Sequence, residues 1–345
     1  MIPHSRPTLD AEDAARVAAV VRGGFLAQGP EAAAFEREMA RYLGVEDAAA
    51  VASGSAALEL ALRALGVGAG DEVVIPTYTC DALHHAVVRC GATPILADAD
   101  PVTAALAVTD VARRLTARTR AIIAVHAFGL ATDLAPLCAL GVPVVEDCAQ
   151  ALGARTAGRR AGALGALAVC SFYATKLLTT GEGGLVAGPA ALVARARDGR
   201  DYDEREDLAP RFNHKLTDMQ AALGRSQLAR FDGFLARRRS LAARYRAALA
   251  GVACELPPDA GEAHVYHRFV VGVRRPVDEV LAALASRGIA ARRPVYRPLH
   301  RARGESGFPV AERLWATQVS LPCYPLLADA DAERVADALR RVLAA

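Results

Sequence analysis

Residues 170–184 read Cys-Ser-Phe-Tyr-Ala-Thr-Lys-Leu-Leu-Thr-Thr-Gly-Glu-Gly-Gly. An apolar run with the composition of a strand, 166–173, leads into this stretch, and a second apolar run, 185–187, follows it. Lys176 lies between the two runs, ahead of a glycine-rich turn that requires special backbone geometry. If the Lys176 ammonium is partly buried, loss of water lowers its pKa and leaves a nucleophilic amine suited to Schiff-base formation. The alternative is a lysine that extends its charge to solvent from a strand end.

The bulk properties are those of a globular protein. The chain has 345 residues, 53% of them hydrophobic, and a formal net charge of +3. This length favours two domains, and the small charge argues against a dedicated nucleic-acid binder. No signal-peptide pattern appears at the start, and the apolar runs are too short to span a membrane. Seven scattered cysteines without a Cys-x-x-Cys pair indicate neither a metal site nor disulfides, so we expect a cytoplasmic location.

From residue 48 onwards, strand-like and helix-like segments alternate. This alternation predicts an α/β fold with a large, mostly parallel sheet covered by helices on both faces. In such a sheet, ligands bind where loops leave the carboxyl ends of the strands. Two amphipathic helices, 9–22 and 30–43, precede the sheet. The expected strands are 49–52, 72–75, 94–97, 121–125 and 142–146. The expected helices are 55–65, one that follows the strand 72–75 and ends at residue 88, 108–115 and 133–140.

The pattern changes towards the C-terminus. Residues 199–213 are charged and irregular, which predicts a surface loop, and 216–249 predict one long helix or two with a break near Gly233. After Pro257 and Pro258 a smaller α+β unit is expected, with strands at 267–273 and near 289–292, and helices at 277–286 and 331–343. We therefore expect a large domain of residues 1–235 and a small domain of residues 236–345.

The expected long helix carries a basic cluster, formed by Arg237, Arg238, Arg239, Arg244 and Arg246. Such a cluster suits a nucleic-acid surface, but acidic residues elsewhere balance its charge. We favour a solvated helix face, with neither nucleic acid nor membrane as a partner.

Asp147 ends an apolar strand within Val-Val-Glu-Asp-Cys-Ala-Gln-Ala-Leu-Gly (144–153). A carboxylate beside a pyridine nitrogen favours the protonated ring, which is the electron sink of pyridoxal 5'-phosphate (PLP). The alternative is that Asp147 caps a following helix, which leaves Lys176 unexplained. Gln150 could touch either the ring face or the ring hydroxyl.

Residues 53–57, Ser-Gly-Ser-Ala-Ala, close the first strand and open a helix. The free N–H groups at a helix start suit a phosphate, so Gly54, Ser55 and Ala56 are candidates to bind it. The same residues would also suit an ordinary helix cap. The hydroxyl of Ser171 is a further candidate. Phosphate site, Asp147 and Lys176 follow the order that a PLP-binding fold needs.

These motifs resemble the DegT/DnrJ/StrS family of PLP-dependent enzymes, which are mostly sugar aminotransferases. The resemblance rests on residues 145–154, on 171–176 with Gly-Glu-Gly-Gly, and on Asn213 with Asp-Met-Gln-Ala-Ala-Leu-Gly (218–224). Matches at 64–73, 125–129 and 321–325 extend it over nearly the whole chain. It implies the aspartate aminotransferase-like (type I) fold and a homodimer with shared active sites. It also implies amino transfer from glutamate or glutamine to a keto sugar, usually nucleotide-linked, or to a keto-cyclitol in some relatives.

The resemblance assigns roles to single residues. Lys176 forms the Schiff base, Asp147 pairs with the pyridine nitrogen and Gln150 contacts the cofactor. Dehydratase members carry histidine where this chain has Lys176, which favours transamination.

Three polar residues are assigned to the cofactor phosphate. Ser55 and Ser171 bind it within the subunit, and Asn213 reaches the phosphate of the other subunit. The alternative for Asn213 is a cap on the helix expected to begin near Leu216.

One position departs from the family. Relatives usually place an aromatic residue over the cofactor ring where this chain has Cys80. Either Cys80 covers the ring as a small polarizable group, or a side chain such as His126 helps.

The stretch Val-Tyr-Arg-Pro-Leu-His (295–300) resembles the family's substrate loop. We therefore expect the substrate to be contacted by His126, Arg292, Arg293, Tyr296 and His300, unless the arginines are plain surface charges. No metal is expected.

Two other classes of function fit less well. A nicotinamide-dependent Rossmann enzyme needs Gly-x-Gly-x-x-Gly after the first strand, which Ser53-Gly54-Ser55 does not supply. A non-catalytic binding or regulatory role would be favoured by loss of Lys176 or Asp147, and both are present.

Overall fold

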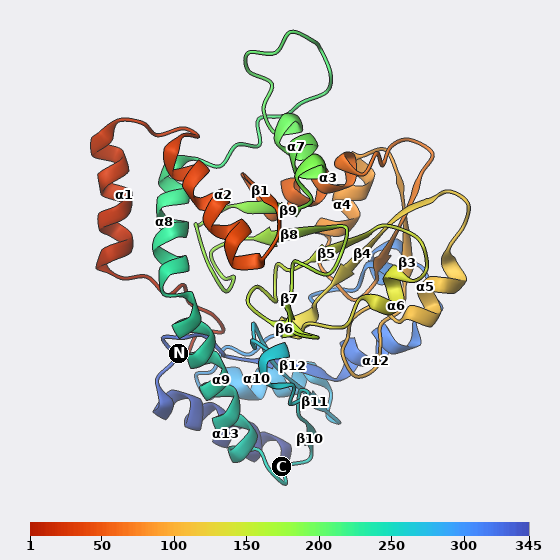
Figure 1. Cartoon of the computed structure of the whole chain (residues 1–345). Coiled ribbons are helices and arrows are strands. Elements are labelled where there is room, and N and C mark those ends of the chain that lie inside the picture. Colours follow the sequence, from red (N-terminus) through yellow and green to blue (C-terminus); the bar gives the residue numbers. More distant parts are fainter. Residues whose placement is uncertain (345) are drawn as a thin grey trace.

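A seven-stranded sheet in the order β1-β9-β8-β5-β4-β2-β3 forms the centre of the larger part of the molecule (Figure 1). The computed structural model describes residues 1–344. Strands β8, β5, β4, β2 and β3 pair in parallel, and β9 pairs antiparallel with both β8 and β1. The expected mostly parallel sheet is confirmed. Its strands are β1 Asp47–Val51, β2 Glu72–Pro76, β3 Thr93–Ala97, β4 Thr119–Val125, β5 Val144–Asp147, β8 Leu167–Ser171 and β9 Gly184–Gly188.

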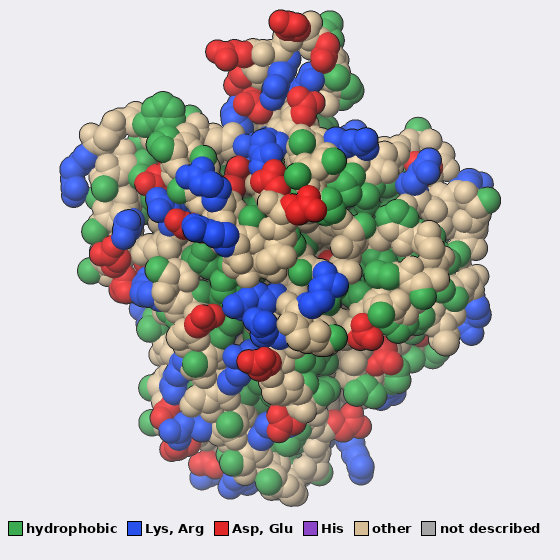
Figure 2. All heavy atoms as spheres, viewed as in Figure 1, with side chains coloured by type: hydrophobic (Ala, Val, Ile, Leu, Met, Phe, Trp, Pro, Cys, Tyr) green, Lys and Arg blue, Asp and Glu red, His purple; other side chains and the backbone are tan. Residues whose placement is uncertain are grey.

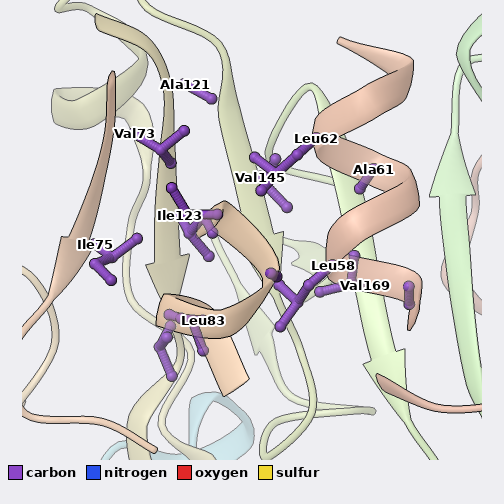
Figure 3. Close-up of a cluster of buried hydrophobic side chains, with 14 of the residues drawn as sticks. Leu58, Ala61, Leu62, Val73, Ile75, Leu83, Ala121, Ile123, Val145 and Val169 are labelled. Carbon is purple, nitrogen blue, oxygen red and sulfur yellow. The ribbon is translucent and has the colours of Figure 1, made fainter. Parts of the chain in front are cut away.

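Helices cover both faces of this sheet, because strand side chains alternate between the faces. On one face Leu58, Ala61 and Leu62 of α3, spaced three or four apart, pack against apolar strand residues (Figure 3). Helices α4 and α7 share that face, and α2, α5 and α6 lie on the other. The bounds are α2 Pro30–Leu43, α3 Gly54–Ala64, α4 Ala82–Arg89, α5 Val108–Arg114, α6 Ala135–Cys138 and α7 Ala190–Gly199, with a turn of 3-10 helix, η1 Ala127–Gly129, and a small hairpin, β6 Arg155–Thr156 and β7 Arg159–Arg160.

Of the two alternatives for 216–249, the structure has two helices and not one long one. Helix α8 (Asp218–Ala229) begins at a capping box of Thr217 and Gln220 and packs on α1 (Ala11–Gly23). Helix α9 (Phe231–Ala248) follows after a break at Arg230, where the backbone leaves helical geometry. The break lies at Arg230, three residues before the expected Gly233, and the Arg230 guanidinium lies 2.6 Å from an Asp13 carboxylate oxygen.

The smaller part of the molecule is an antiparallel sheet in the order β10-β11-β12, covered by helices. Its elements are β10 Cys254–Glu255, η2 Gly261–Ala263, β11 Phe269–Val273, α10 Val277–Ala285, α11 Leu299–Arg303, α12 Pro309–Thr317, β12 Gln318–Leu321 and α13 Asp329–Ala344. Ile2 belongs to the core of this part, and its N–H donates to the Gly288 carbonyl at 2.7 Å. The first residues of the chain therefore lie with the small domain and not with the large one.

The strand expected near 289–292 is wrong. Ile289 and Arg292 form only isolated bridges, to Ile2 and Ser320, and the strand that pairs with β11 is β12. Pro294 has no N–H with which to extend the ladder beyond Arg292.

Helix α9 packs into two hydrophobic cores. Phe231, Phe234 and Leu235 belong to a core beneath the large sheet, whereas Leu241 and Tyr245 belong to the core of the small domain. The change between cores lies close to the proposed domain boundary at 235.

The solvated-face prediction for the basic cluster of α9 is wrong for Arg238. This side chain is buried, and its guanidinium donates to the carbonyls of Tyr266, His267 and Cys323 at 3.2, 3.3 and 2.6 Å. Arg237 and Arg244 pair with Asp329. These arginines fasten α9 to the small domain.

The charged surface loop expected over 199–213 is present between α7 and α8. It stands out from the body in Figure 1, and Figure 2 shows acidic and basic side chains crowded on it. Among residues 1–344, no helix is both long and apolar enough to cross a membrane.

Candidate active site

Most of the candidate residues lie at one edge of the large sheet. Asp147 and Ser171 are the last residues of β5 and β8, and Gly54 and Cys80 follow β1 and β2. These four strands run in the same direction, so their carboxyl ends meet at the same edge. Lys176 lies in the connection between β8 and β9, at the same edge.

The glycines after Lys176 form a turn with the special backbone geometry that the sequence predicted. Gly181 and Gly183 have φ angles of 81° and 158°, a region that side chains rarely adopt. A Cβ at Gly184 would lie 2.3 Å from the Ser53 carbonyl oxygen. Glycine at 184 therefore lets the β8–β9 connection approach the turn that opens α3.

That turn, with Ser171, forms a cup suited to a phosphate. A Cβ at Gly54 would lie 2.8 Å from Ser171 Cβ and 3.0 Å from its Oγ, so the two residues touch. The Ser53 hydroxyl caps α3 by accepting from the Ala56 N–H at 3.1 Å, which uses the Ala56 donor. Within residues 1–344, the N–H groups of Gly54 and Ser55 have no hydrogen-bond acceptor. Two free donors at a helix start fit a phosphate group.

Asp147 and Lys176 are both shifted towards their neutral forms. Burial raises the pKa of the Asp147 carboxyl, against opposing effects of the Ala149 N–H and Lys176. Burial also lowers the pKa of Lys176, against opposing effects of Cys80 and Asp147. A buried carboxyl at a strand end fits a cationic ring nitrogen, and a lysine of lowered pKa fits Schiff-base chemistry. The helix-cap alternative for Asp147 is wrong, because residues 149–153 form turns and no helix.

Gln150 is oriented by the backbone. Its side-chain oxygen accepts from the Phe128 N–H at 3.0 Å, which leaves the amide NH₂ as a donor for a ligand. Phe128 has a φ of 57°, an uncommon value for a residue with a side chain. Cys80, at the position of the missing aromatic ring, is exposed.

Both candidate histidines are buried and hydrogen-bonded within the protein. His126 is 0% exposed: its Nε2–H donates to Glu146 at 2.8 Å, and its Nδ1 accepts from the Thr132 N–H at 3.1 Å. His300 is 1% exposed, and its ring nitrogens bind Thr77 and Glu312 at 2.8 and 2.6 Å. The prediction that they contact the substrate is wrong, because both rings are buried and other protein groups occupy all four ring nitrogens.

The other candidates of the substrate loop line one pocket. Arg292, Arg293 and Tyr296 surround a space of about 870 Å³, and Tyr296 is 88% exposed. Arg268 also lines this pocket, and it interacts electrostatically with Lys176. Sequence reasoning missed Arg268, although its charge at the edge of the apolar run 269–273 was a signal.

Asn213 lies exposed in the connection that leads to α8. The alternative that it caps this helix is wrong, because the cap is Thr217. The backbone carbonyl of the next residue, His214, accepts from the Ala52 N–H at 2.8 Å, which holds this segment beside the end of β1.

Residues 7–340 match the sequence model of the DegT/DnrJ/EryC1/StrS aminotransferase family. The chain belongs to this family. It is 39% identical to dTDP-3-amino-3,4,6-trideoxy-alpha-D-glucose transaminase of Streptomyces venezuelae, over 96% of this chain and 92% of that protein. It is 36% identical to UDP-N-acetyl-3-dehydro-alpha-D-glucosamine 3-aminotransferase of Acidithiobacillus ferrooxidans, over 91% and 89%.

Solved structures agree with this assignment. The aminotransferase TlmJ of Streptoalloteichus hindustanus superposes with a TM-score of 0.95, at 34% identity over 100% of this chain and 99% of that one. The sugar aminotransferase Spr1654 of Streptococcus pneumoniae, solved in its PLP form, gives 0.94 at 26% identity, over 99% and 98%. The family member described here is a PLP-dependent aminotransferase with the type I fold.

Proposed function

We propose that this aminotransferase moves an amino group from glutamate or glutamine to a nucleotide-linked keto sugar in amino-sugar biosynthesis. Two named relatives support the acceptor class, because they act on dTDP- and UDP-linked sugars. In this chain, the observation that carries the proposal is the arginine-lined pocket of about 870 Å³, one of whose lining residues, Arg268, interacts electrostatically with Lys176. A pocket of this size accommodates a substrate larger than a free sugar.

The site residues divide the work of transamination. When bound, PLP supplies an electrophilic carbon and an electron sink. The Lys176 amine would hold the cofactor and, once free, would be the general base and acid that moves a proton at the substrate carbon. Asp147 would favour the protonated form of the ring nitrogen, and that positive charge would in turn favour the ionised carboxylate. Gln150 would donate to the cofactor ring, and the N–H groups of Gly54 and Ser55, with the Ser171 hydroxyl, would hold the phosphate.

The amino-group acceptor is tested in two half-reactions. The PLP-loaded enzyme is first converted with glutamate, freed of keto acid, and then mixed with a keto sugar while the cofactor absorbance is followed. UDP- and dTDP-linked keto sugars should restore the starting spectrum, whereas the same sugars without nucleotide should not. Restoration by the free keto sugar or by a keto-cyclitol alone would contradict the proposal.

The working unit in this proposal is a homodimer in which Asn213 completes the phosphate site of the partner subunit. The exposed loop ahead of Asn213 supports this, since it presents Tyr202 and Leu208, 55% and 102% exposed, away from the body. A two-fold interface makes the exchange reciprocal. A cytoplasmic location is also proposed, in keeping with seven free cysteines.

Subunit complementation tests the exchange. Lys176→Ala and Asn213→Ala dimers, each impaired alone, are mixed, dissociated and allowed to reassociate. If Asn213 acts across the interface, each mixed dimer contains one site with both native residues, and activity returns. If Asn213 acts within its own subunit, every site stays defective.

A further inference from the structure

The buried side chain of His126 closes the turn that follows β4. Its Nδ1 accepts from the Thr132 N–H at 3.1 Å, so the ring joins the two ends of segment 127–131, which contains η1. Because Nδ1 accepts an N–H, the ring proton lies on Nε2. Nε2–H donates to Glu146 at 2.8 Å, and both side chains are 0% exposed. Bonds at both nitrogens therefore hold the ring in one orientation.

Glu146 is a fixed anchor for this ring. Besides His126, its carboxylate accepts from three backbone N–H groups at 2.6, 2.9 and 3.1 Å, those of Gly162, Leu164 and Gly165. With Cys148, the two residues form a cluster whose ligand atoms lie within 4.8 Å of one another, close enough to hold a metal ion. The hydrogen bonds that already occupy Glu146 and the His126 Nδ1 favour a structural network instead.

The turn that His126 closes has a strained backbone. Phe128 has φ and ψ angles of 57° and 8°, a left-handed conformation that residues with a side chain rarely adopt. Such a conformation persists only where the surrounding structure holds it. On one side, the N–H groups of Val265 and Arg268 donate to the Gly129 and Phe128 carbonyls at 2.9 and 3.1 Å. The His126 ring holds the turn from the other side.

This turn also contacts two residues of the candidate active site. The Phe128 N–H donates to the Gln150 side-chain oxygen at 3.0 Å, and the His126 N–H donates to the Asp147 carbonyl at 3.2 Å. The direction of the Phe128 N–H depends on the backbone angles of the turn. If the turn relaxed, this N–H would turn away and Gln150 would lose its orientation.

We propose that His126 is a positioning residue for amino transfer: by closing this turn, it fixes the Phe128 N–H that orients Gln150 towards the cofactor ring. The inference rests on the cofactor contact proposed for Gln150. The competing role is that of a core residue, in which case the loss of His126 would lower stability without acting through Gln150.

A double-mutant cycle on PLP binding separates these roles. The dissociation constant of PLP is measured by absorbance titration for the native chain, Gln150→Ala, His126→Phe and the double variant. Phenylalanine keeps a ring at 126 and removes both ring hydrogen bonds. Each single variant should raise the constant about three- to tenfold, and the double variant should bind no more weakly than the weaker single one. The absorption maximum of bound PLP should shift equally in all three.

Three results would overturn the proposal. The first is a double variant whose loss of affinity is the product of the two single losses, because the residues then act independently. The second is native PLP affinity in His126→Phe. The third is native affinity in Gln150→Ala, which would remove the cofactor contact that His126 is proposed to position.

His300 provides the matched control. It is 1% exposed and both of its ring nitrogens are bonded, but its partners are Thr77 and Glu312. His300→Phe should also lower the free energy of unfolding. Any effect that it has on PLP affinity should multiply with that of Gln150→Ala. Loss of this independence would show that any buried histidine couples to Gln150, against a specific role for His126.

A second variant covers a failure of His126→Phe to fold. In His126→Gln the amide NH₂ can still donate to Glu146, whereas the Thr132 N–H loses its acceptor, so mainly the closure of the turn is removed. The cycle with Gln150→Ala should again show no further loss of affinity. These titrations use no acceptor sugar. Failure to aminate a nucleotide-linked sugar would therefore count against the proposed function alone.

Discussion

Gly54→Ala tests the phosphate cup most directly. The added Cβ would lie 2.8 Å from Ser171 Cβ, whereas non-bonded carbons rest at about 3.5–4.0 Å. The start of α3 and the end of β8 must then separate by about 0.7–1.2 Å. Both segments have apolar residues in one core, so this overpacking should cost about 1–3 kcal/mol of unfolding free energy. The shift also displaces the Gly54 and Ser55 N–H groups, so the dissociation constant of PLP should rise about tenfold or more.

The assay pairs urea unfolding of the cofactor-free protein with a PLP titration followed by absorbance. Gly68→Ala is the control, because a Cβ there meets no atom within 4 Å. It should leave both measurements near native values. Native stability in Gly54→Ala would show that α3 and β8 are not in contact at this point. Lost stability with unchanged PLP affinity would show that the phosphate lies elsewhere.

Three further changes have definite expected outcomes. Lys176→Ala should slow the glutamate half-reaction by at least about 10²–10⁴-fold. Lys215→Ala should leave the rate unchanged, because Asp201 and Asp203 pair with the Lys215 ammonium and raise its pKa. Attachment of the cofactor to Lys215 after borohydride treatment would contradict this prediction. Cys80→Phe should tighten PLP binding by about 0.5–1.5 kcal/mol through stacking, since Cys80 is exposed, and weakened binding with a lower melting temperature would refute an open ring face. Hydrogen bonds from Arg301 and His300 lower the pKa of Glu312 from 4.5 to about 2, so the stability they provide is present above pH 4.5 and lost as the pH falls towards 2. Glu312→Gln should therefore cost up to about 1 kcal/mol at pH 7 and almost nothing near pH 2, and a constant difference in urea unfolding would contradict the assignment.

The sequence predicted the parts of the fold that depend on local pattern. The alternation of strand-like and helix-like segments predicted the large sheet. The glycines after Lys176 predicted a turn, and Gly181 and Gly183 form it with positive φ angles. Asp147 could be placed because it ends a short apolar strand, and strand ends in parallel sheets meet at one edge.

Long-range contacts explain what the sequence did not predict. The Thr77–His300 hydrogen bond joins residues 223 positions apart, and no local pattern shows that such a ring is buried. The pairing of β11 with β12 likewise joins distant segments, so the nearer run at 289–292 was mistaken for the strand. The charge of Arg268 beside the apolar run 269–273 was a signal in the sequence, but its position in the pocket depends on long-range contacts.

Helix α9 makes the stability of the two domains interdependent. Phe234 packs beneath the large sheet and Tyr245 in the small core, and Arg238 fastens the helix to three carbonyls between them. Because one helix contributes residues to both cores, we expect the chain to melt as one cooperative unit. Amide protons of α9 should therefore exchange only through global unfolding. A protease cut within the helix should leave two fragments that are each unable to fold alone.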